Sequence, residues 1–139
     1  MAHYIDPDRA QFEQFKNLPR DEPILMLNLV RFHAAAEYPD GEQISGREAY
    51  ARYGKASGPV FTRNGGEIVW RGNPALVLIG PADEAWDTAF IARYPTASAF
   101  LAMVTDDEYR AAVKHRQAAV STSRLIRMDE VASNGQFAD

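Results

Sequence analysis

Apolar positions along the chain alternate between strand-like and helix-like spacing. The first long apolar run covers residues 24–32 and is interrupted only by Asn28 and Arg31, a pattern typical of a strand buried on both faces. Shorter runs predict further strands at residues 67–72, 75–80, 85–95 and 123–131.

Helical spacing separates these runs. Before the first strand, Asp6 or Asp8 can cap a short amphipathic helix that ends near Pro19. Ser45 and Glu48 have the S-x-x-E spacing of a capping box, in which each side chain bonds an otherwise unpaired amide at the helix start. A longer helix is therefore expected to begin at Ser45.

Further breaks and caps follow. The glycine–proline pair at residues 58–59 should bend or break the longer helix before its glycine-rich end. Thr96 can cap a short helix, and Thr105 with Glu108 repeats the capping-box spacing. The second of these caps predicts a helix that continues to about Val120.

The order of the predicted elements indicates an α+β fold. After the lead-in helix the order is a strand, a helix, two or three strands, a helix pair and a strand. We interpret this order as βαββαβ, which is typical of a ferredoxin-like antiparallel sheet with both main helices on one face. Because the first strand is apolar on both sides, the uncovered face needs a partner layer, and a second copy of the chain is the simplest one. We expect one domain over residues 1–139, with a helical extension at 1–22, a core at 23–130 and a loose tail at 131–139, assembled as a homodimer.

Composition narrows the class of protein. Of 139 residues, 46% are hydrophobic and 24% charged, as in ordinary soluble domains. Cysteine is absent, which removes disulfides, thiolate zinc sites and cysteine nucleophiles and favours a cytoplasmic protein. The net charge of -4 argues against nucleic acid as a partner. No run approaches the ~20 apolar residues that span a bilayer, so no membrane partner is expected.

Several separated motifs resemble a known family. The runs LMLNLVRF, SGREAYARYG, GGEIVWRG, ARYPTASAFLAMVTDDEYRAAVKHR and SRLI are similar, in this order, to the domain of unknown function 1330 family within the dimeric α+β barrel superfamily. This resemblance covers roughly residues 23–128 and implies a ferredoxin-like fold, a barrel-forming dimer, no assigned reaction and no cofactor. The superfamily includes cofactor-free monooxygenases, lactone isomerases and haem-degrading enzymes, but their catalytic residues do not map onto this chain as a set.

Arg116 is the main candidate for binding chemistry. On a helix with ~3.6 residues per turn it lies within about 60° of Tyr109, Ala112 and Val113, in the middle of the apolar stripe. A guanidinium buried there without a partner would be costly. It is expected either to form a salt bridge with Asp87 or Asp83, or to bind a ligand carboxylate or enolate, which its planar fork suits.

The sequence pattern indicates further candidate site residues. His115 lies about 100° around the same helix and is either a general base at the rim of the cleft or a solvated surface residue. Asn28 is a buried amide that needs backbone partners or a polar ligand. Tyr53 and Trp70 are core aromatics or pocket residues that supply one hydrogen bond. The histidines lack metal-ligand spacing, so no metal site is expected.

Two function classes remain open. In the first, the dimer binds a small organic acid or carbonyl compound in a pocket between sheet and helices and carries out cofactor-free acid–base chemistry, with Arg116 orienting an anionic oxygen and His115 moving a proton. In the second, the protein is a non-catalytic homodimeric module whose interior polar groups bond one another. Both share one fold, so the fold cannot decide between them.

Overall fold

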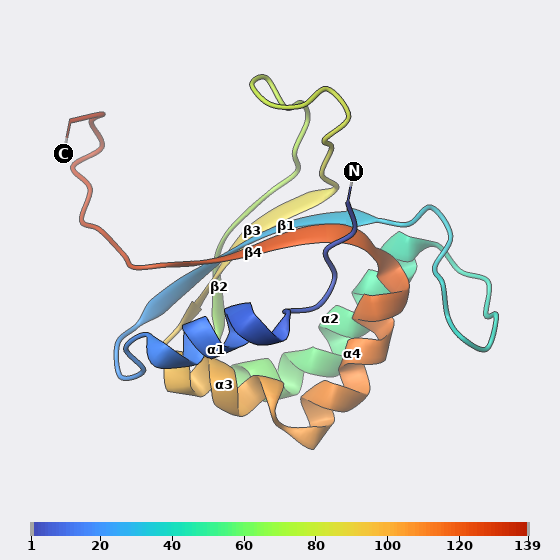
Figure 1. The fold of residues 1–139 in the computed structure, drawn as a ribbon, viewed down its shortest axis with the longest axis horizontal. Helices are drawn as coiled ribbons and strands as arrows, with labels where there is room; N and C mark the ends of the chain where they lie inside the picture. The colour runs from blue at the N-terminus through green and yellow to red at the C-terminus, as the bar shows by residue number, and fades with distance from the viewer. Residues whose placement is uncertain (1, 139) are drawn as a thin grey trace.

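One antiparallel sheet and a layer of helices make up the fold. The structure, a computed structural model, describes residues 2–138. Its elements, in chain order, are α1 (Arg9–Asn17), β1 (Ile24–Phe32), α2 (Gly46–Arg63), β2 (Glu67–Gly72), β3 (Thr88–Tyr94), α3 (Ala97–Val104), α4 (Asp107–Ala119) and β4 (Val120–Met128). All of these helices lie on the same side of the sheet (Figure 1).

The sheet has the strand order β2-β3-β1-β4, so β1 lies in the middle beside both β3 and β4. Both of its pairings are antiparallel, with Leu27 opposite Ile91 on one side and Ile126 on the other. This topology confirms the predicted α+β ferredoxin-like fold with an additional N-terminal helix.

The two faces of the sheet differ in how they are covered. On the helix side, Ile24, Met26 and Val30 of β1 are 0–3% exposed. The other face has an apolar row that crosses all four strands in register, formed by Trp70, Ile91, Leu27 and Ile126. Within it, Trp70 is 52% and Ile126 47% exposed, so this apolar face is open in the single chain.

The predicted helix caps agree with the structure at three of four places. Asp8, Ser45 and Thr96 each accept a backbone N–H at the start of a helix. The start of α4 differs from the prediction, because Asp106 rather than Thr105 is its N-cap and accepts from the Glu108 amide at 2.8 Å.

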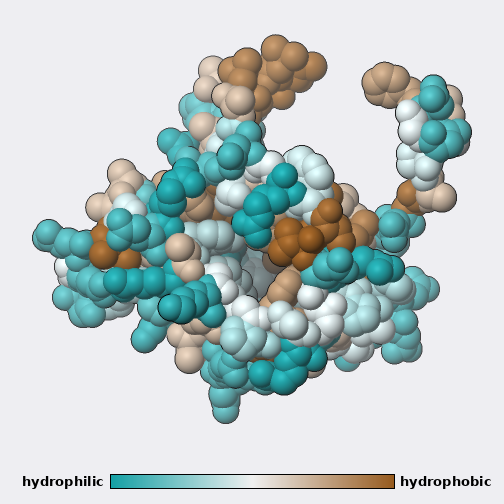
Figure 2. Space-filling view, turned by 180° about the vertical axis from the view of Figure 1, so that it is seen from behind, coloured by the Kyte–Doolittle hydropathy of each residue, from teal (hydrophilic) through white to brown (hydrophobic). Residues whose placement is uncertain are grey.

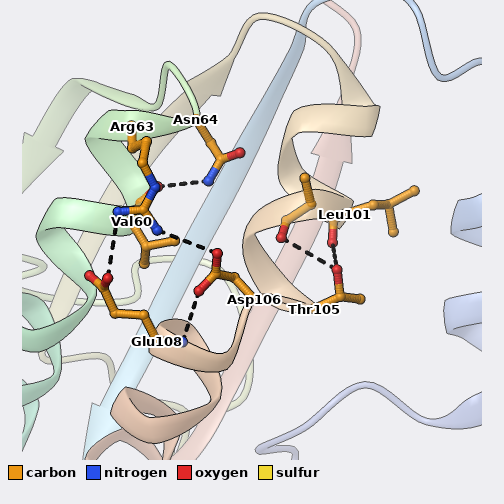
Figure 3. A network of polar contacts seen from close by, with 8 residues as sticks. Val60, Arg63, Asn64, Leu101, Thr105, Asp106 and Glu108 are labelled. Atoms are coloured by element: carbon orange, nitrogen blue, oxygen red, sulfur yellow. Dashed lines mark hydrogen bonds and ion pairs between the residues drawn. The ribbon is translucent and has the colours of Figure 1, made fainter.

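Thr105 is instead the last residue of the preceding turn. Its hydroxyl donates back to the carbonyl of Leu101 at 2.8 Å and therefore closes α3 (Figure 3). Arg63 at the end of α2 pairs with Asp106 and Glu108, which joins the end of one helix to the start of the other (Figure 3). Thr105 thus ends α3, and the adjacent Asp106 caps the start of α4.

Of the bend or break expected at residues 58–59, the break does not occur. α2 runs through Pro59 as one helix of 18 residues. A proline inside a helix leaves the carbonyl four residues earlier without its helical bond. Here that residue is Lys55, and both Pro59 and Lys55 are exposed, so solvent can reach the unpaired carbonyl.

The predicted strand at residues 75–80 is also wrong. The segment between β2 and β3 is a long loop that rises from the sheet, on the side away from the helices (Figure 1). Leu76, Leu78 and Ile79 are 80%, 85% and 93% exposed, and they form the apolar tip seen above the body in Figure 2. Apolar residues alone do not make a strand when no neighbouring strand is available to pair with.

Gly46 fixes the start of α2 against the sheet and provides a stability test. A Cβ at this position would lie 2.0 Å from the His33 carbonyl oxygen, whereas one at Gly54 in the same helix meets nothing within 4 Å. We expect Gly46→Ala to lower the free energy of unfolding by about 1–3 kcal/mol, as overpacking does. Gly54→Ala, the matched control, should raise it by about 0.5–1 kcal/mol.

Urea unfolding followed by circular dichroism checks both values. A Gly46→Ala protein as stable as the wild type would show that the close approach of these two backbones is not required.

Candidate functional site

A cavity of about 870 Å³ lies between the sheet and the helices. Its floor is a second row across the sheet, in register and facing the helices, formed by Arg71, Phe90, Asn28 and Leu125. The helix side supplies aromatic walls, among them Tyr50 and Tyr53 of α2 and Tyr109 of α4. The face seen from behind is hollowed near its centre (Figure 2).

The N-terminal segment closes one side of this cavity. The Tyr4 carbonyl accepts from the Ser123 amide at 2.7 Å and from its hydroxyl at 2.8 Å. The Thr122 hydroxyl donates to the Ala2 carbonyl at 2.9 Å and accepts from the Tyr4 amide at 3.1 Å. Residues 2–5 therefore run along the start of β4, and we call them the N-terminal arm.

Arg116 projects from α4 to the place where this arm meets the sheet. Its guanidinium donates to the Ile5 carbonyl and, at 3.1 Å, to the Ser123 hydroxyl. The expected salt bridge to Asp87 or Asp83 is not formed, and Asp87 instead accepts from the Phe32 amide at 2.8 Å. Among the described residues, Arg116 thus bonds neutral oxygens and no carboxylate.

The other guanidiniums that line the cavity also have no carboxylate partner among the described residues. Arg127 donates to the carbonyls of Phe15 and Pro19. Arg124 lies over the ring of Tyr4, 4.9 Å from its centroid, and Arg71 lies over Phe90 at 5.6 Å. None of these side chains forms an ion pair within residues 2–138.

Some arginines outside the cavity do pair with carboxylates. Arg52 pairs with Glu42 at 2.7 Å, and Arg63 pairs with Asp106 at 3.3 Å. Within the described residues that line the cavity, Asp6 is the acidic one, against four arginines. The cavity is therefore electropositive in a chain whose net charge is -4, so its lining favours a negatively charged occupant.

Tyrosines form a second polar feature of the cavity. The Tyr53 and Tyr109 hydroxyls are 2.8 Å apart and share a hydrogen bond. Burial raises the pKa of Tyr109, and the neighbouring Tyr53 adds to the effect. Burial likewise raises the pKa of Tyr50, while the charges of Arg116 and Arg71 oppose the rise. The phenols of Tyr50 and Tyr109 are therefore neutral hydrogen-bond groups at physiological pH.

Three of the predicted binding residues come together. Arg116, Asn28 and Tyr53 all line the cavity, from three different elements. The Asn28 amide nitrogen donates to the Met26 carbonyl at 3.1 Å. Its side-chain oxygen has no hydrogen-bond donor among the described residues and is not enclosed by protein, so it faces the cavity.

Trp70 lies on the opposite face of the sheet and does not line the cavity. Simple alternation would put it on the same side as Ile68, which does line the cavity. The pairing with β3 shifts between these two residues, so Trp70 pairs with Ile91 and turns outward. The same bulge brings Arg71 into the cavity, and no pattern in the sequence indicated this.

His115 also lies outside the cavity. Its ring nitrogen Nδ1 is 2.7 Å from the Tyr38 hydroxyl, which belongs to the segment before α2. Burial lowers the pKa of His115, and the charges of Lys114 and Arg52 lower it further. The turn of about 100° from Arg116 is enough to direct this side chain away from the cleft that its neighbour enters.

Several residues that line the cavity were missed, among them Tyr50 and Arg71. Tyr50 and Arg71 both line it, yet Tyr50 has the spacing of a core residue and Arg71 depends on the bulge. No group of three or more histidine, aspartate or glutamate side chains within residues 2–138 is arranged to hold a metal ion. None of the helices in that range has the length and apolar character needed to cross a bilayer.

The fold and the cavity define the class of this protein as ferredoxin-like α+β, with an electropositive pocket. The model of the family described as "Domain of unknown function (DUF1330)" matches residues 41–130. Because this match covers well over half of the sequence, the chain belongs to the DUF1330 family, as the sequence motifs predicted.

Solved structures agree with this assignment. The RPA0582 protein of Rhodopseudomonas palustris, a protein of unknown function, is 54% identical, with a TM-score of 0.91 over 95% of this chain and 100% of that chain. Its methylated form has 54% identity and a TM-score of 0.93 over 98% and 100%.

A more distant structure shares the fold alone. SnoaB, a cofactor-independent oxygenase of Streptomyces nogalater, is 15% identical, with a TM-score of 0.53 over 83% of this chain and 99% of that chain. No curated protein matches the chain.

The buried tyrosines predict a loss of stability at alkaline pH. The folded pKa of Tyr50, Tyr94 and Tyr109 lies above the ordinary value of 10.0, chiefly because of burial. Their contribution to stability is therefore complete below pH 10.0 and is lost as the pH rises beyond it. The free energy of unfolding should fall from about pH 9 to about pH 12, and Tyr109→Phe should reduce this fall.

Urea unfolding at a series of pH values, with phenolate absorbance recorded in parallel, measures both effects. If every tyrosine ionised near pH 10 in a protein that stayed folded, these phenols would not be buried as the structure has them.

Proposed function

We propose that this protein binds a small organic acid or carbonyl compound in the cavity between sheet and helices. The observation that carries the proposal is Arg116, a guanidinium on the cavity wall whose partners are neutral oxygens. A ligand carboxylate or enolate would supply the missing negative charge through a charge-assisted, bidentate hydrogen bond.

The remaining lining fits such a ligand. The volume of about 870 Å³ lies within the range of small-molecule sites. Aromatic side chains such as Phe90 and Tyr53 offer apolar contacts, and the side-chain oxygen of Asn28 offers a hydrogen-bond acceptor. A mostly apolar pocket with a few convergent polar groups is the usual form of a ligand site.

The proposal concerns binding rather than catalysis. Proton transfer by His115 would need this ring within hydrogen-bond reach of the bound molecule. His115 bonds Tyr38 outside the cavity instead, so we assign it no step. Burial raises the pKa of Tyr109, so its phenol stays protonated, and it acts here as a hydrogen-bond group together with the hydroxyl of Tyr53.

Replacing Arg116 tests the acid site. With benzoate as the probe, Arg116→Met should weaken binding about 10- to 100-fold, because a hydrogen bond to a charged group contributes about 1.5–3 kcal/mol. Benzamide, which has the same shape without the charge, should bind weakly to both proteins. Isothermal titration calorimetry measures these affinities.

Two controls separate recognition from structural support. Ser123→Ala removes one of the bonds that hold the N-terminal arm but keeps the guanidinium, and it should retain benzoate binding. Arg63→Met removes an arginine outside the cavity and should leave the affinity for benzoate unchanged. Equal losses in Ser123→Ala and Arg116→Met would mean that the arm, and not the charge, matters.

The second candidate, a homodimeric module, is favoured by the open face of the sheet. The row through Trp70, Ile91, Leu27 and Ile126 is continuous and apolar, and such a face is normally covered by another layer. A second copy packed sheet on sheet would bury both rows at once. This assembly leaves the cavity untouched, so dimerisation and ligand binding are compatible.

A charge at the centre of the row tests the dimer. Leu27→Asp should convert the protein to monomers at micromolar concentration, because an unpaired carboxylate would have to be buried between two sheets. Leu18→Asp places the same charge at the end of α1, on the helix side, and should leave the dimer intact. Sedimentation velocity distinguishes the two states, and a monomeric wild type would exclude the assembly.

The absence of cysteine and the net charge of -4 support a cytoplasmic location and no nucleic-acid partner.

A further inference from the structure

The cavity has polar donors at two opposite edges of the sheet. Arg116 ends near β4, where it bonds Ser123. Arg71 comes from β2, the strand at the other edge, and reaches inward over Phe90 at 5.6 Å. Neighbouring strands lie ~4.8 Å apart, so three spacings put the backbones of β2 and β4 ~14 Å apart. The two guanidiniums therefore approach the cavity from different ends.

Tyr50 lines the cavity from the helix side and packs against the same core cluster as Phe90, over which Arg71 lies. Its ring packs against Phe32 at 5.0 Å and against Tyr53 at 5.4 Å, which fixes the direction of the side chain. Among the described residues its hydroxyl has no hydrogen-bond partner, although the residue lines the cavity. A phenol with a fixed ring and an unused O–H donor is suited to bind a ligand oxygen.

Arg71 is likewise available. Its guanidinium carbon lies over the ring of Phe90, a cation–π contact, and its N–H groups bond no carboxylate within residues 2–138. Such a contact favours a position of the guanidinium over the cavity floor. Asn28 is next to Phe90 in the register, so the floor continues from Arg71 toward the middle of the cavity.

We propose that Arg71 and Tyr50 form a second oxygen-binding end, so that the ligand is an elongated aromatic acid with a carboxylate at Arg116 and a second carboxylate or carbonyl oxygen at this end. The proposal rests on the acid site proposed above and extends it by naming the ligand class. The aromatic body lies over Phe90 and against Tyr53, where the lining is apolar.

A matched pair of probes isolates the second end. Terephthalate carries carboxylates at both ends of a ring, and 4-isopropylbenzoate has the same shape with no oxygen at the second end. The wild type should bind terephthalate at least about tenfold more tightly than 4-isopropylbenzoate, as one charge-assisted hydrogen bond provides. In Arg71→Met and in Tyr50→Phe, this preference should fall below about threefold.

Arg93→Met is the control for Arg71. It removes an arginine from the neighbouring strand β3 on the other face of the sheet, where Arg93 lies 3.9 Å from Glu130, and the preference should persist. Tyr50→Phe keeps the ring and its packing against Phe32, so this variant should fold like the wild type. Circular dichroism checks that it does.

The outcomes separate the two proposals. A preference for terephthalate that survives in both Arg71→Met and Tyr50→Phe overturns the second end, even if Arg116→Met weakens both probes. Unchanged binding of both probes in Arg116→Met overturns the acid site itself. If the wild type binds neither probe at millimolar concentration, both proposals fall for aromatic acids.

Discussion

The helices of this protein cover one face of the sheet, and the other features of the molecule depend on that constraint. Covering one face creates a shielded layer in which α2, α3, α4 and α1 enclose a cavity. It also leaves an apolar row through Leu27 without cover on the opposite face. Exposing the apolar row on the uncovered face to water is unfavourable, so this face favours a partner layer. The face covered by helices has room for a small molecule.

The N-terminal arm and the cavity arginines depend on each other. The arm runs beside β4 through bonds to Thr122 and Ser123, and its Ile5 carbonyl then accepts from Arg116. A guanidinium bonded to neutral carbonyls keeps its full charge. The arm therefore lines one side of the cavity and leaves the charge of Arg116 without a carboxylate partner, and such a charge attracts an anion more strongly in a low-dielectric site than in water.

Local signals in the sequence predicted most of the fold and singled out three residues that line the cavity, Arg116, Asn28 and Tyr53. Capping residues and apolar spacing located the helices, and alternation placed Asn28 on the helix side, because these effects act within a few residues. Thr105 misled the prediction of a helix cap, and Pro59 did not break its helix, since the choice between adjacent caps and the exposure of an unpaired carbonyl depend on neighbouring elements. Trp70 and Arg71 lie on the faces opposite to those that simple alternation gives, because a bulge shifts the register, and a bulge depends on pairing between strands.

By itself, the sequence determined the order of elements, the family and the odd position of Arg116 on an apolar stripe, since spacing along a chain decides which side chains share a helix face. Only the tertiary structure decided what Arg116 meets. One of its two partners is the carbonyl of Ile5, which lies 111 residues away in the chain, and Asp87 is not a partner. Contacts over such separations follow from how the elements pack, and no local pattern specifies them.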